Sequence, residues 1–238
     1  MKKQIHRAND RGSAEHGWLH TKYSFSFADW YEPSRMGFGA LRVINDDIID
    51  PSSGFGAHTH HDMEIITIVL KGTVTHKDSM GNIGTVPAGD VQVMSAGSGV
   101  THSEYNDSST EALSLFQIWI ESSSRGITPR YGQKSFRNQS QKNVLQSLVV
   151  SDEDVSTSDA LTIHQNASIS RAVVEPGNSI DYTLRSPQHG VYVFIVEGEI
   201  EIDRTAFGKR DAVGIFDTTQ ILISTKTGAE ILLIDVPR

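Results

Sequence analysis

The chain has 238 residues, no cysteine and a formal net charge of −8. Its length suits one large all-β domain or two small ones, and the lack of cysteine excludes disulfides, iron–sulfur clusters and thiol nucleophiles. With 29 acidic and 21 basic side chains and no run of Lys or Arg, direct nucleic-acid binding is not expected. We expect a cytoplasmic protein without a membrane span, because MKKQIHRAND lacks the apolar stretch of a secretory signal and no apolar run approaches ~20 residues.

Short segments rich in Val, Ile, Thr and aromatic residues, with Gly, Asn, Asp or Pro between them, predict an all-β fold of sandwich or barrel layers. The first group of expected strands is 39–46, 64–70, 72–78 and 113–121. The last of these, LSLFQIWIE, is apolar almost throughout, which indicates a strand covered on both faces. Residues 122–142 are polar and lack an apolar period, so we interpret them as a connection between two halves.

The second half of the chain repeats the β pattern. Strands are expected at 167–177, 179–186, 190–203 and 229–237, and one short helix is expected within 141–150. The segments IVLKGTVTH and FIVEGEIEI share one arrangement, in which an apolar strand, a charged residue and a glycine precede an alternating strand. This internal repeat predicts two related β-barrels in tandem, of which the first alone keeps its histidines.

Histidine and carboxylate side chains occur together in two short motifs. His58 and His60 lie within HTHHDMEII, and His102 and Glu104 lie within VTHSEYN. Residues i and i+2 of a strand share a face, so each motif offers two ligands side by side. One such pair can also be a polar strand edge, but two pairs that converge in a barrel predict a metal site with three imidazoles and a carboxylate. That donor set suits Fe(II), Cu(II), Ni(II), Mn(II) or Zn(II), and four protein ligands plus an open position favour iron.

Three neighbouring residues bear on the ligand set. His61 has the opposite parity and is expected to point away from the site. Glu64 is the alternative carboxylate, but on a straight strand it lies roughly 13 Å from His60, so Glu104 is favoured. His76 lies near a predicted hairpin turn and is expected to be structural or exposed.

Residues 54–106 resemble the pirin family of the cupin superfamily. The resemblance is carried by the His-x-His and His-x-Glu motifs and by the intervening PAGDVQVMSAGSGV. Residues 16–47, HGWLHTKYSFSFADWYEPSRMGFGALRVINDD, resemble the bacterial members that are often named quercetin 2,3-dioxygenase, and LFQIWI and GITPRY extend the match. The second half is similar to the shortened C-terminal cupin of the family, with weaker motifs.

The resemblance implies a bicupin, with two antiparallel jelly-roll-like β-barrels packed face to face. It implies a metal-binding cupin domain at 1–131 and a C-terminal cupin domain without a metal site at 132–238. The metal ligands of the family map onto His58, His60, His102 and Glu104. Phe55 and Met94 fall at positions that look pocket-lining in the family. Residues 61–63 are His-Asp-Met where vertebrate members have Arg-Gly-Phe, so a cationic pocket residue of those members is absent here.

The activity that the resemblance implies is metal-dependent cleavage of a quercetin-like flavonol with O₂ and release of CO. Fe(II) is the expected metal, with Cu, Ni, Mn or Zn as alternatives. Glu104 would take the proton of the flavonol 3-hydroxyl as a general base. Two alternatives stay open. One is a non-enzymatic regulatory or redox-sensing protein that acts through a protein partner, and the other is a metallocupin for an unrelated small molecule.

Overall fold

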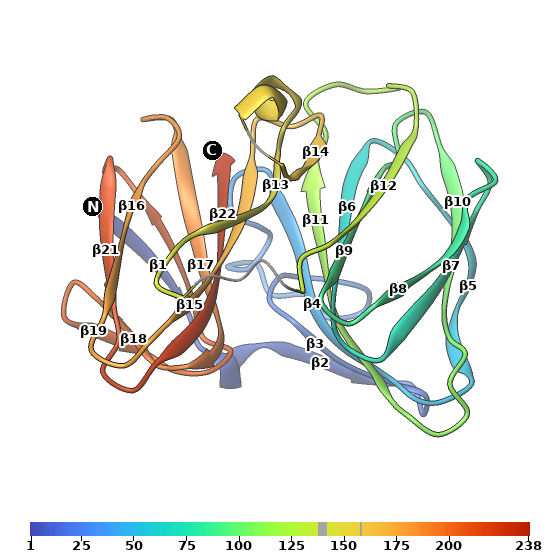
Figure 1. The fold of residues 1–238 in the computed structure, drawn as a ribbon, viewed down its shortest axis with the longest axis horizontal. Helices are drawn as coiled ribbons and strands as arrows, with labels where there is room; N and C mark the ends of the chain where they lie inside the picture. Colours follow the sequence, from blue (N-terminus) through green and yellow to red (C-terminus); the bar gives the residue numbers. More distant parts are fainter. Residues whose placement is uncertain (138–141, 158) are drawn as a thin grey trace.

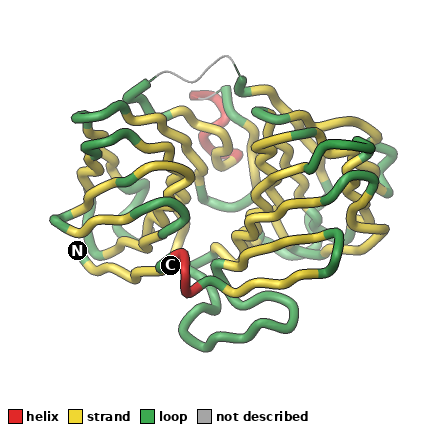
Figure 2. The backbone as a smooth tube through the Cα atoms, turned by 90° about the horizontal axis from the view of Figure 1, so that it is seen from below, coloured by secondary structure: helices red, strands yellow, loops and turns green. Residues whose placement is uncertain are grey.

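The computed structural model describes residues 1–137, 142–157 and 159–238, which form two β-barrels that lie side by side (Figures 1 and 2). Each barrel consists of a seven-stranded and a four-stranded sheet. The described residues contain only two helical segments, the short 3-10 turns η1 (Ala8–Asp10) and η2 (Asp152–Thr157), and neither is long or apolar enough to cross a membrane. The all-β prediction is therefore confirmed.

The first barrel takes its strands from the first half of the chain. Its large sheet has the order β12-β9-β6-β11-β4-β3-β2, and its small sheet has the order β5-β10-β7-β8. The bounds are β2 (Gly12–Glu15), β3 (Leu19–Tyr23), β4 (Leu41–Ile49), β5 (Ser53–His60), β6 (Met63–Lys71), β7 (Thr73–Asp78), β8 (Ile83–Pro87), β9 (Asp90–Ser95), β10 (Val100–Asn106), β11 (Leu113–Glu121) and β12 (Arg130–Ser135).

The second barrel repeats this sheet arrangement with later strands and with the first strand of the chain. Its large sheet has the order β1-β20-β17-β22-β15-β13-β14, and its small sheet has the order β16-β21-β18-β19. The bounds are β1 (Lys2–His6), β13 (Gln146–Ser151), β14 (Leu161–Ile163), β15 (Ser168–Val174), β16 (Ser179–Thr183), β17 (His189–Gly198), β18 (Ile200–Ile202), β19 (Thr205–Phe207), β20 (Ala212–Phe216), β21 (Gln220–Ser224) and β22 (Ala229–Pro237).

The two large sheets pack against each other and share one hydrophobic core. Phe116 of β11 meets Phe194 of β17 edge to face, with the ring centroids 5.3 Å apart. Ile118 from the first barrel and Leu232 and Ile234 from the second are buried in the same cluster. This shared core is the face-to-face packing of two barrels that the family resemblance implies.

Strand β11 shows why its sequence is apolar almost throughout. Phe116 and Ile118 point into the core between the barrels, whereas Leu115 packs inside the first barrel. Gln117 and Trp119 share the parity of Leu115 and line a pocket in that barrel. Both faces of the strand are therefore covered, as the sequence predicts. The side chains of Gln117 and Trp119, on one face of β11, line the pocket.

The sequence predicts a short helix within residues 141–150. Residue 141 lies outside the described residues, and for residues 142–150 the expectation is wrong. Residues 146–151 form strand β13, which pairs antiparallel with β15 and parallel with β14. Val149 and Val150 are β-branched and both buried, although successive strand residues point to opposite faces. Tertiary pairing thus decides the conformation of a segment whose helical propensity was weak.

The strand pairing bears on the expected division at residues 131 and 132. That position falls inside β12, which pairs with β9 over its whole length and so belongs to the first barrel. In the opposite direction, β1 pairs with β20 and adds an edge strand to the second barrel (Figure 1). The division into domains at residue 131 stays a prediction. Strand β12 of the first barrel extends past this position, and strand β1 of the second barrel lies before it.

Candidate metal centre and its pocket

Three histidines converge where the small sheet closes the first barrel. Strand β10 runs antiparallel to β5 with His102 directly opposite His58, so hydrogen bonding between the strands brings the two motifs together. The ring centroids lie 4.4 Å apart for His58 and His102, 4.8 Å for His58 and His60, and 5.0 Å for His60 and His102. One ring nitrogen from each histidine lies within 4.8 Å of the other two.

These imidazoles fit a transition-metal ion. His102 is 2% exposed, and neither of its ring nitrogens has a hydrogen-bond partner among the described residues. His58 Nδ1 donates to the Gly56 carbonyl oxygen at 2.8 Å, which leaves Nε2 free to ligate. Two nitrogens bound to one ion lie at most ~4.2 Å apart. Small rotations of the three rings would bring their nitrogens from within 4.8 Å of one another to this distance.

Electrostatics also prepares the histidines for a cation. Burial, and to a smaller extent the neighbouring imidazoles, lower the pKa of His60 to about 4 and the pKa of His102 to about 3. Both rings are therefore neutral near physiological pH, and a neutral imidazole has the lone pair that a metal requires.

Glu104 is fixed by three side chains of the large sheet. It is 3% exposed, and its carboxylate accepts hydrogen bonds from Gln117 Nε2 at 2.5 Å, Thr67 Oγ1 at 3.2 Å and Gln92 Nε2 at 3.5 Å. Burial raises the pKa of Glu104 to about 7. The carboxylate thus lies inside the barrel in one defined orientation, held by amide and hydroxyl donors.

The strand pairing places Glu104 beside His76. On one side of β10 a β-bulge in β5, with one extra residue between Phe55 and His58, leaves Glu104 opposite Phe55. On the other side the register against β7 is regular and sets Glu104 opposite His76, so the oxygen of Glu104 groups with His102 and His76 rather than with the His58 side of the site. The four residues of the expected ligand set therefore lie around His102 in two overlapping groups.

Glu64, the alternative carboxylate, lies elsewhere. Its oxygens accept hydrogen bonds from Ser95 Oγ at 2.6 Å and Ser122 Oγ at 3.1 Å. The sequence argument measured the distance from His60 to Glu64 along a straight strand, but the chain turns at Asp62, whose φ is +51°, between β5 and β6. Glu64 therefore belongs to a strand of the other sheet and to neither histidine group.

His76 is the polar neighbour that the sequence did not assign to the site. It is fully buried, its Nε2 pairs with Asp78 Oδ2 at 3.1 Å, and its ring stacks on Tyr131 at 4.8 Å. Its Nδ1 has no hydrogen-bond partner among the described residues, and one of its ring nitrogens lies in one group with His102 and Glu104. His61, by contrast, is exposed and donates from Nδ1 to the Ser98 carbonyl oxygen at 3.1 Å.

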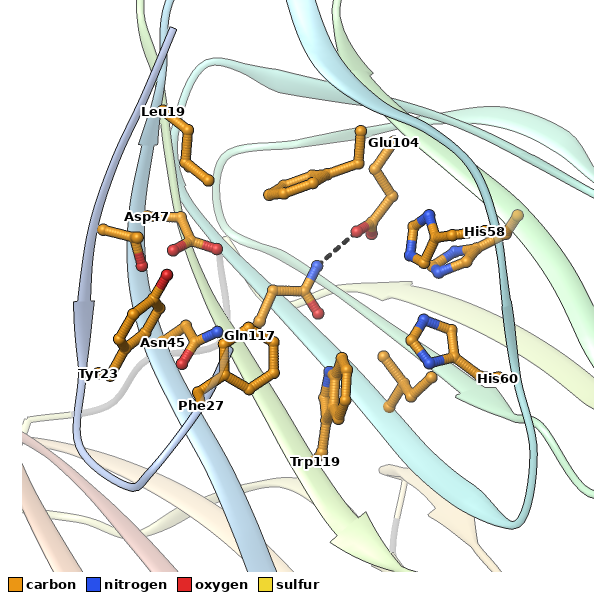
Figure 3. A pocket seen from close by; sticks show the side chains of 14 residues that line it. Leu19, Tyr23, Phe27, Asn45, Asp47, His58, His60, Glu104, Gln117 and Trp119 are labelled. Carbon is orange, nitrogen blue, oxygen red and sulfur yellow. Dashed lines mark hydrogen bonds between the residues drawn. The ribbon is translucent and has the colours of Figure 1, made fainter. Parts of the chain in front are cut away.

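A cavity of about 180 Å³ opens beside the histidines inside the first barrel (Figure 3). Aromatic and aliphatic side chains form much of its wall, namely Leu19, Phe27, Phe55, Ile65 and Trp119. Phe55 packs edge-on against Trp18 at 5.1 Å, so its ring is held at the wall. Met94 is not among the lining residues, because it is fully buried in a core cluster with Ile65 and Val100; its expected place at the pocket is a core position.

A row of polar residues crosses the floor of this cavity. Asn45 of β4 pairs opposite Gln117 of β11, Gln117 opposite Thr67 of β6, and Thr67 opposite Gln92 of β9. Tyr23 of β3 lies beyond Asn45 in the same register. The sequence shows each polar residue within an apolar strand, but only the register reveals that they form one continuous row facing Glu104.

Asp47 lies beside the end of this row. It is 2% exposed, and its Oδ1 has no hydrogen-bond partner among the described residues. Burial raises the pKa of Asp47 to about 7. Figure 3 shows Asp47, Asn45 and Tyr23 on the side of the pocket opposite His58 and His60.

These features define a two-barrel cupin with a histidine-lined pocket in its first barrel, whose side chains could hold a metal ion. The pirin family model matches residues 4–120, and the model of the quercetinase C-terminal cupin domain matches residues 148–236. The chain is 44% identical to "Quercetin 2,3-dioxygenase" of Escherichia coli K12 over 98% of both chains, and 43% identical to a "Pirin-like protein" of Caulobacter vibrioides over 94% of this chain and 95% of that one. The chain belongs to the pirin family.

A solved structure of a relative bears on the metal. The crystal structure of the bacterial pirin YhhW from Escherichia coli in complex with nickel(II) matches with a TM-score of 0.92 and 42% identity, and the match covers 99% of both chains. The two-barrel architecture is therefore shared over the whole length of the chain.

Proposed function

We propose that the protein is a metal-dependent quercetin 2,3-dioxygenase, which opens a flavonol with O₂ and releases CO. The observation that carries the proposal is the convergence of His58, His60 and His102, with free ring nitrogens, beside an aromatic pocket. The name and the full-length similarity of the Escherichia coli relative support the same activity.

His58, His60, His102 and Glu104 would hold the ion, and Fe(II) is the metal we propose, with Ni(II) supported by the YhhW complex and Cu, Mn or Zn as further candidates. A bound ion supplies Lewis acidity toward the flavonol oxygens and a redox path between flavonol and O₂. Because Glu104 lies on the inner side of His102, its oxygen contacts such an ion only if the carboxylate or the ion shifts toward the other.

Glu104 is positioned to act on the substrate as a proton acceptor. Gln117, Thr67 and Gln92 hold its carboxylate in place, and a fixed base within reach of a hydroxyl is what general base catalysis requires. We propose that Glu104 takes the proton of the 3-hydroxyl and so makes the flavonol anionic and readily oxidised. Phe27, Phe55 and Trp119 would flank the planar rings and exclude water from the pocket.

Turnover with quercetin tests the proposal. Protein loaded with Fe(II) or Ni(II) is mixed with quercetin and O₂, and loss of the flavonol absorbance and release of CO are followed. We expect turnover above that of the same metal without protein, and Glu104→Gln should keep the metal but lose most of this turnover. If metal-loaded wild-type protein gives no excess turnover, the proposal fails; capture of a protein partner that depends on the metal state would then favour a regulatory role.

A further inference from the structure

Beside Thr21 Oγ1, a hydroxyl opposite Asp47 that itself lacks a partner among the described residues, three further buried oxygen atoms in the wall of the pocket lack hydrogen-bond partners there. They are Asp47 Oδ1, Asn45 Oδ1 and Gln117 Oε1, and the three residues are 2%, 6% and 7% exposed. Folded proteins rarely leave buried polar groups unpaired, so each such atom calls for an explanation. All three atoms are hydrogen-bond acceptors, so the group that they would bind must donate hydrogen bonds.

The orientation of Gln117 supports this assignment. Its Nε2 donates to Glu104 at 2.5 Å, and this bond places Oε1 on the other end of the amide. Asp47 and Asn45 lie two residues apart on β4, so they share the face that lines the pocket. The acceptors therefore come from two neighbouring strands and belong to one side of one cavity.

The position of these acceptors relative to the metal centre is defined. Asp47 and Asn45 lie across the pocket from His58 and His60, with Gln117 between the two sides (Figure 3). The cavity of about 180 Å³ is slightly larger than the roughly 150 Å³ that holds one benzene ring in a dry protein cavity. One hydroxylated ring thus fits inside, while the rest of a flavonol extends toward the histidines and the mouth.

The walls between the two sides favour an aromatic ligand over a sugar or an aliphatic polyol. Leu19, Phe27 and Ile65 line the cavity together with the acceptors. A ring with apolar faces and hydroxyl groups on its edge matches apolar walls and acceptors at one end. Phenolic hydroxyls are also better hydrogen-bond donors than aliphatic ones, and a carboxylate strengthens such a bond.

We propose that Asp47, Asn45 and Gln117 form a hydroxyl-binding subsite, which selects flavonols that carry phenolic hydroxyls on the ring distant from the metal centre. The inference rests on the proposed function, because it takes the substrate to be a flavonol. Asp47 is the residue to test, since Gln117 also holds Glu104 and a change there would disturb the base.

Binding without O₂ separates recognition from chemistry. Wild-type protein is titrated anaerobically with four flavonols, and quenching of tryptophan fluorescence gives the Kd. The ligands are quercetin, galangin with additional hydroxyls only on the fused ring, a flavonol hydroxylated only on the pendant ring, and 3-hydroxyflavone with neither. We expect quercetin to bind at least about tenfold more tightly than 3-hydroxyflavone, because 3-hydroxyflavone lacks the hydroxyls that would form one or two buried hydrogen bonds.

Variants of Asp47 then test the subsite. Asp47→Leu should bring the ratio of the two Kd values close to one, and Asp47→Asn should give an intermediate ratio, because a neutral amide is a weaker acceptor than a carboxylate. Ile49→Val is the matched control: Ile49 lies on the same strand and face but does not line the pocket, and the ratio should stay as in the wild type. Of galangin and the flavonol hydroxylated only on the pendant ring, the one that loses its advantage over 3-hydroxyflavone in Asp47→Leu identifies the ring that the subsite holds.

Two results would overturn the inference. If the wild type binds quercetin and 3-hydroxyflavone equally, or if Asp47→Leu keeps the wild-type ratio, ordered water rather than substrate satisfies these acceptors. In either case quercetin turnover would be unaffected, so the proposed function would stand. Failure of every flavonol to bind would instead overturn both the subsite and the proposed function.

Discussion

The two barrels have the same sheet order but opposite interiors. By position in their sheets, β5 and β10 of the first barrel correspond to β16 and β21 of the second. In the first barrel these two strands point His58, His60, His102 and Glu104 inward. In the second barrel the inward residues of the same strands are Ile180, Tyr182, Ile221 and Ile223, all buried in one hydrophobic cluster. The backbone arrangement is thus compatible with either a metal centre or an apolar core, and the side chains alone decide which is formed.

The large sheets show the same contrast. The row Gln117–Thr67–Gln92 crosses β11, β6 and β9 in the first barrel. The corresponding strands of the second barrel, β22, β17 and β20, carry the row Leu233–Val193–Val213. Amide and hydroxyl groups inside a barrel cost free energy unless they are paired, and in the first barrel they are used to hold Glu104.

The buried aspartates of the two barrels differ in their partners. Asp235 in the second barrel accepts hydrogen bonds from Tyr182 Oη at 2.9 Å and pairs with His189 Nδ1 at 2.6 Å. Asp47 in the first barrel keeps an unpartnered oxygen that lines a cavity. A satisfied buried carboxylate stabilises the fold, whereas an unsatisfied one beside a cavity is available to a ligand. Four substitutions, apart from their controls, test the contrast between the two barrels.

The largest expected effect is on stability in the second barrel. His189→Ala removes the imidazole that pairs with the fully buried Asp235. Breaking a buried pair by removing one partner costs about 3–5 kcal/mol, since the other partner stays buried without compensation. Urea unfolding should show this loss, and Ni(II) affinity of the folded variant should stay as in the wild type. A loss below about 1 kcal/mol would contradict a stabilising role for this network.

The second prediction concerns metal affinity in the first barrel. His102 belongs to both groups of potential ligands, so His102→Ala should weaken Ni(II) or Co(II) binding by more than about 100-fold, beyond the effect expected for loss of an outer-sphere partner. Calorimetric titration measures the affinity. His164→Ala, which changes a histidine of the second half outside both groups, is the control. Equal affinities for the two variants would place the ion elsewhere.

The third prediction is a gain in folding stability, where the first is a loss. Asp47→Asn should stabilise the protein by roughly 1–3 kcal/mol at neutral or higher pH, because a buried carboxylate with an unpaired oxygen carries a desolvation cost. The folded pKa of Asp47 is raised to about 7 from 3.8. The folded state therefore holds its proton while the unfolded state releases it, so the destabilisation by Asp47 develops as pH rises from about 4 to about 7.

The pH series must separate Asp47 from the charges near it. Asp46 precedes it on the other face of β4, Thr21 and Tyr23 face it from β3, and Glu104 faces it from β10. These groups are present in both proteins, so the difference in free energy of unfolding between the wild type and Asp47→Asn isolates Asp47. The difference should be near zero at about pH 4 and largest above about pH 7. A difference independent of pH would contradict the raised pKa.

The sequence predicts features that depend on neighbouring residues and misses those that depend on contacts between distant strands. Alternation and turn residues give β4, β6, β7 and β11 of the first barrel and β15, β16, β17 and β22 of the second, because these signals act over a few residues. The i, i+2 spacing also places His58 and His60 on one face, and the antiparallel pairing of β5 with β10 brings His102 to them. Asp47 and the polar row could not be predicted in this way, because their proximity depends on the register of strands that are distant in the sequence.

Two local features account for the remaining differences around the site. The turn at Asp62 separates β5 from β6, and it removes Glu64 from the strand on which the sequence argument placed it. The β-bulge in β5, between Phe55 and His58, shifts the register of β5 against β10 by one residue. Gly56 lies in this bulge, whereas the turn at Asp62 carries neither glycine nor proline, so the sequence does not reveal that Glu64 starts a different strand.

The smallest predicted effect concerns His76 of β7. The corresponding strand of the second barrel, β18, buries Ile200 and Ile202 in its hydrophobic cluster. His76→Phe keeps an aromatic ring against Tyr131 but removes the nitrogens that face Asp78, His102 and Glu104. We expect Co(II) affinity to fall by about tenfold and the visible spectrum of bound Co(II) to change, because groups around metal ligands set their orientation. His61→Ala, which alters an exposed histidine next to the site, should change neither. If His76→Phe also leaves affinity and spectrum unchanged, His76 serves only the packing of the first barrel, and the metal centre ends at His102 and Glu104.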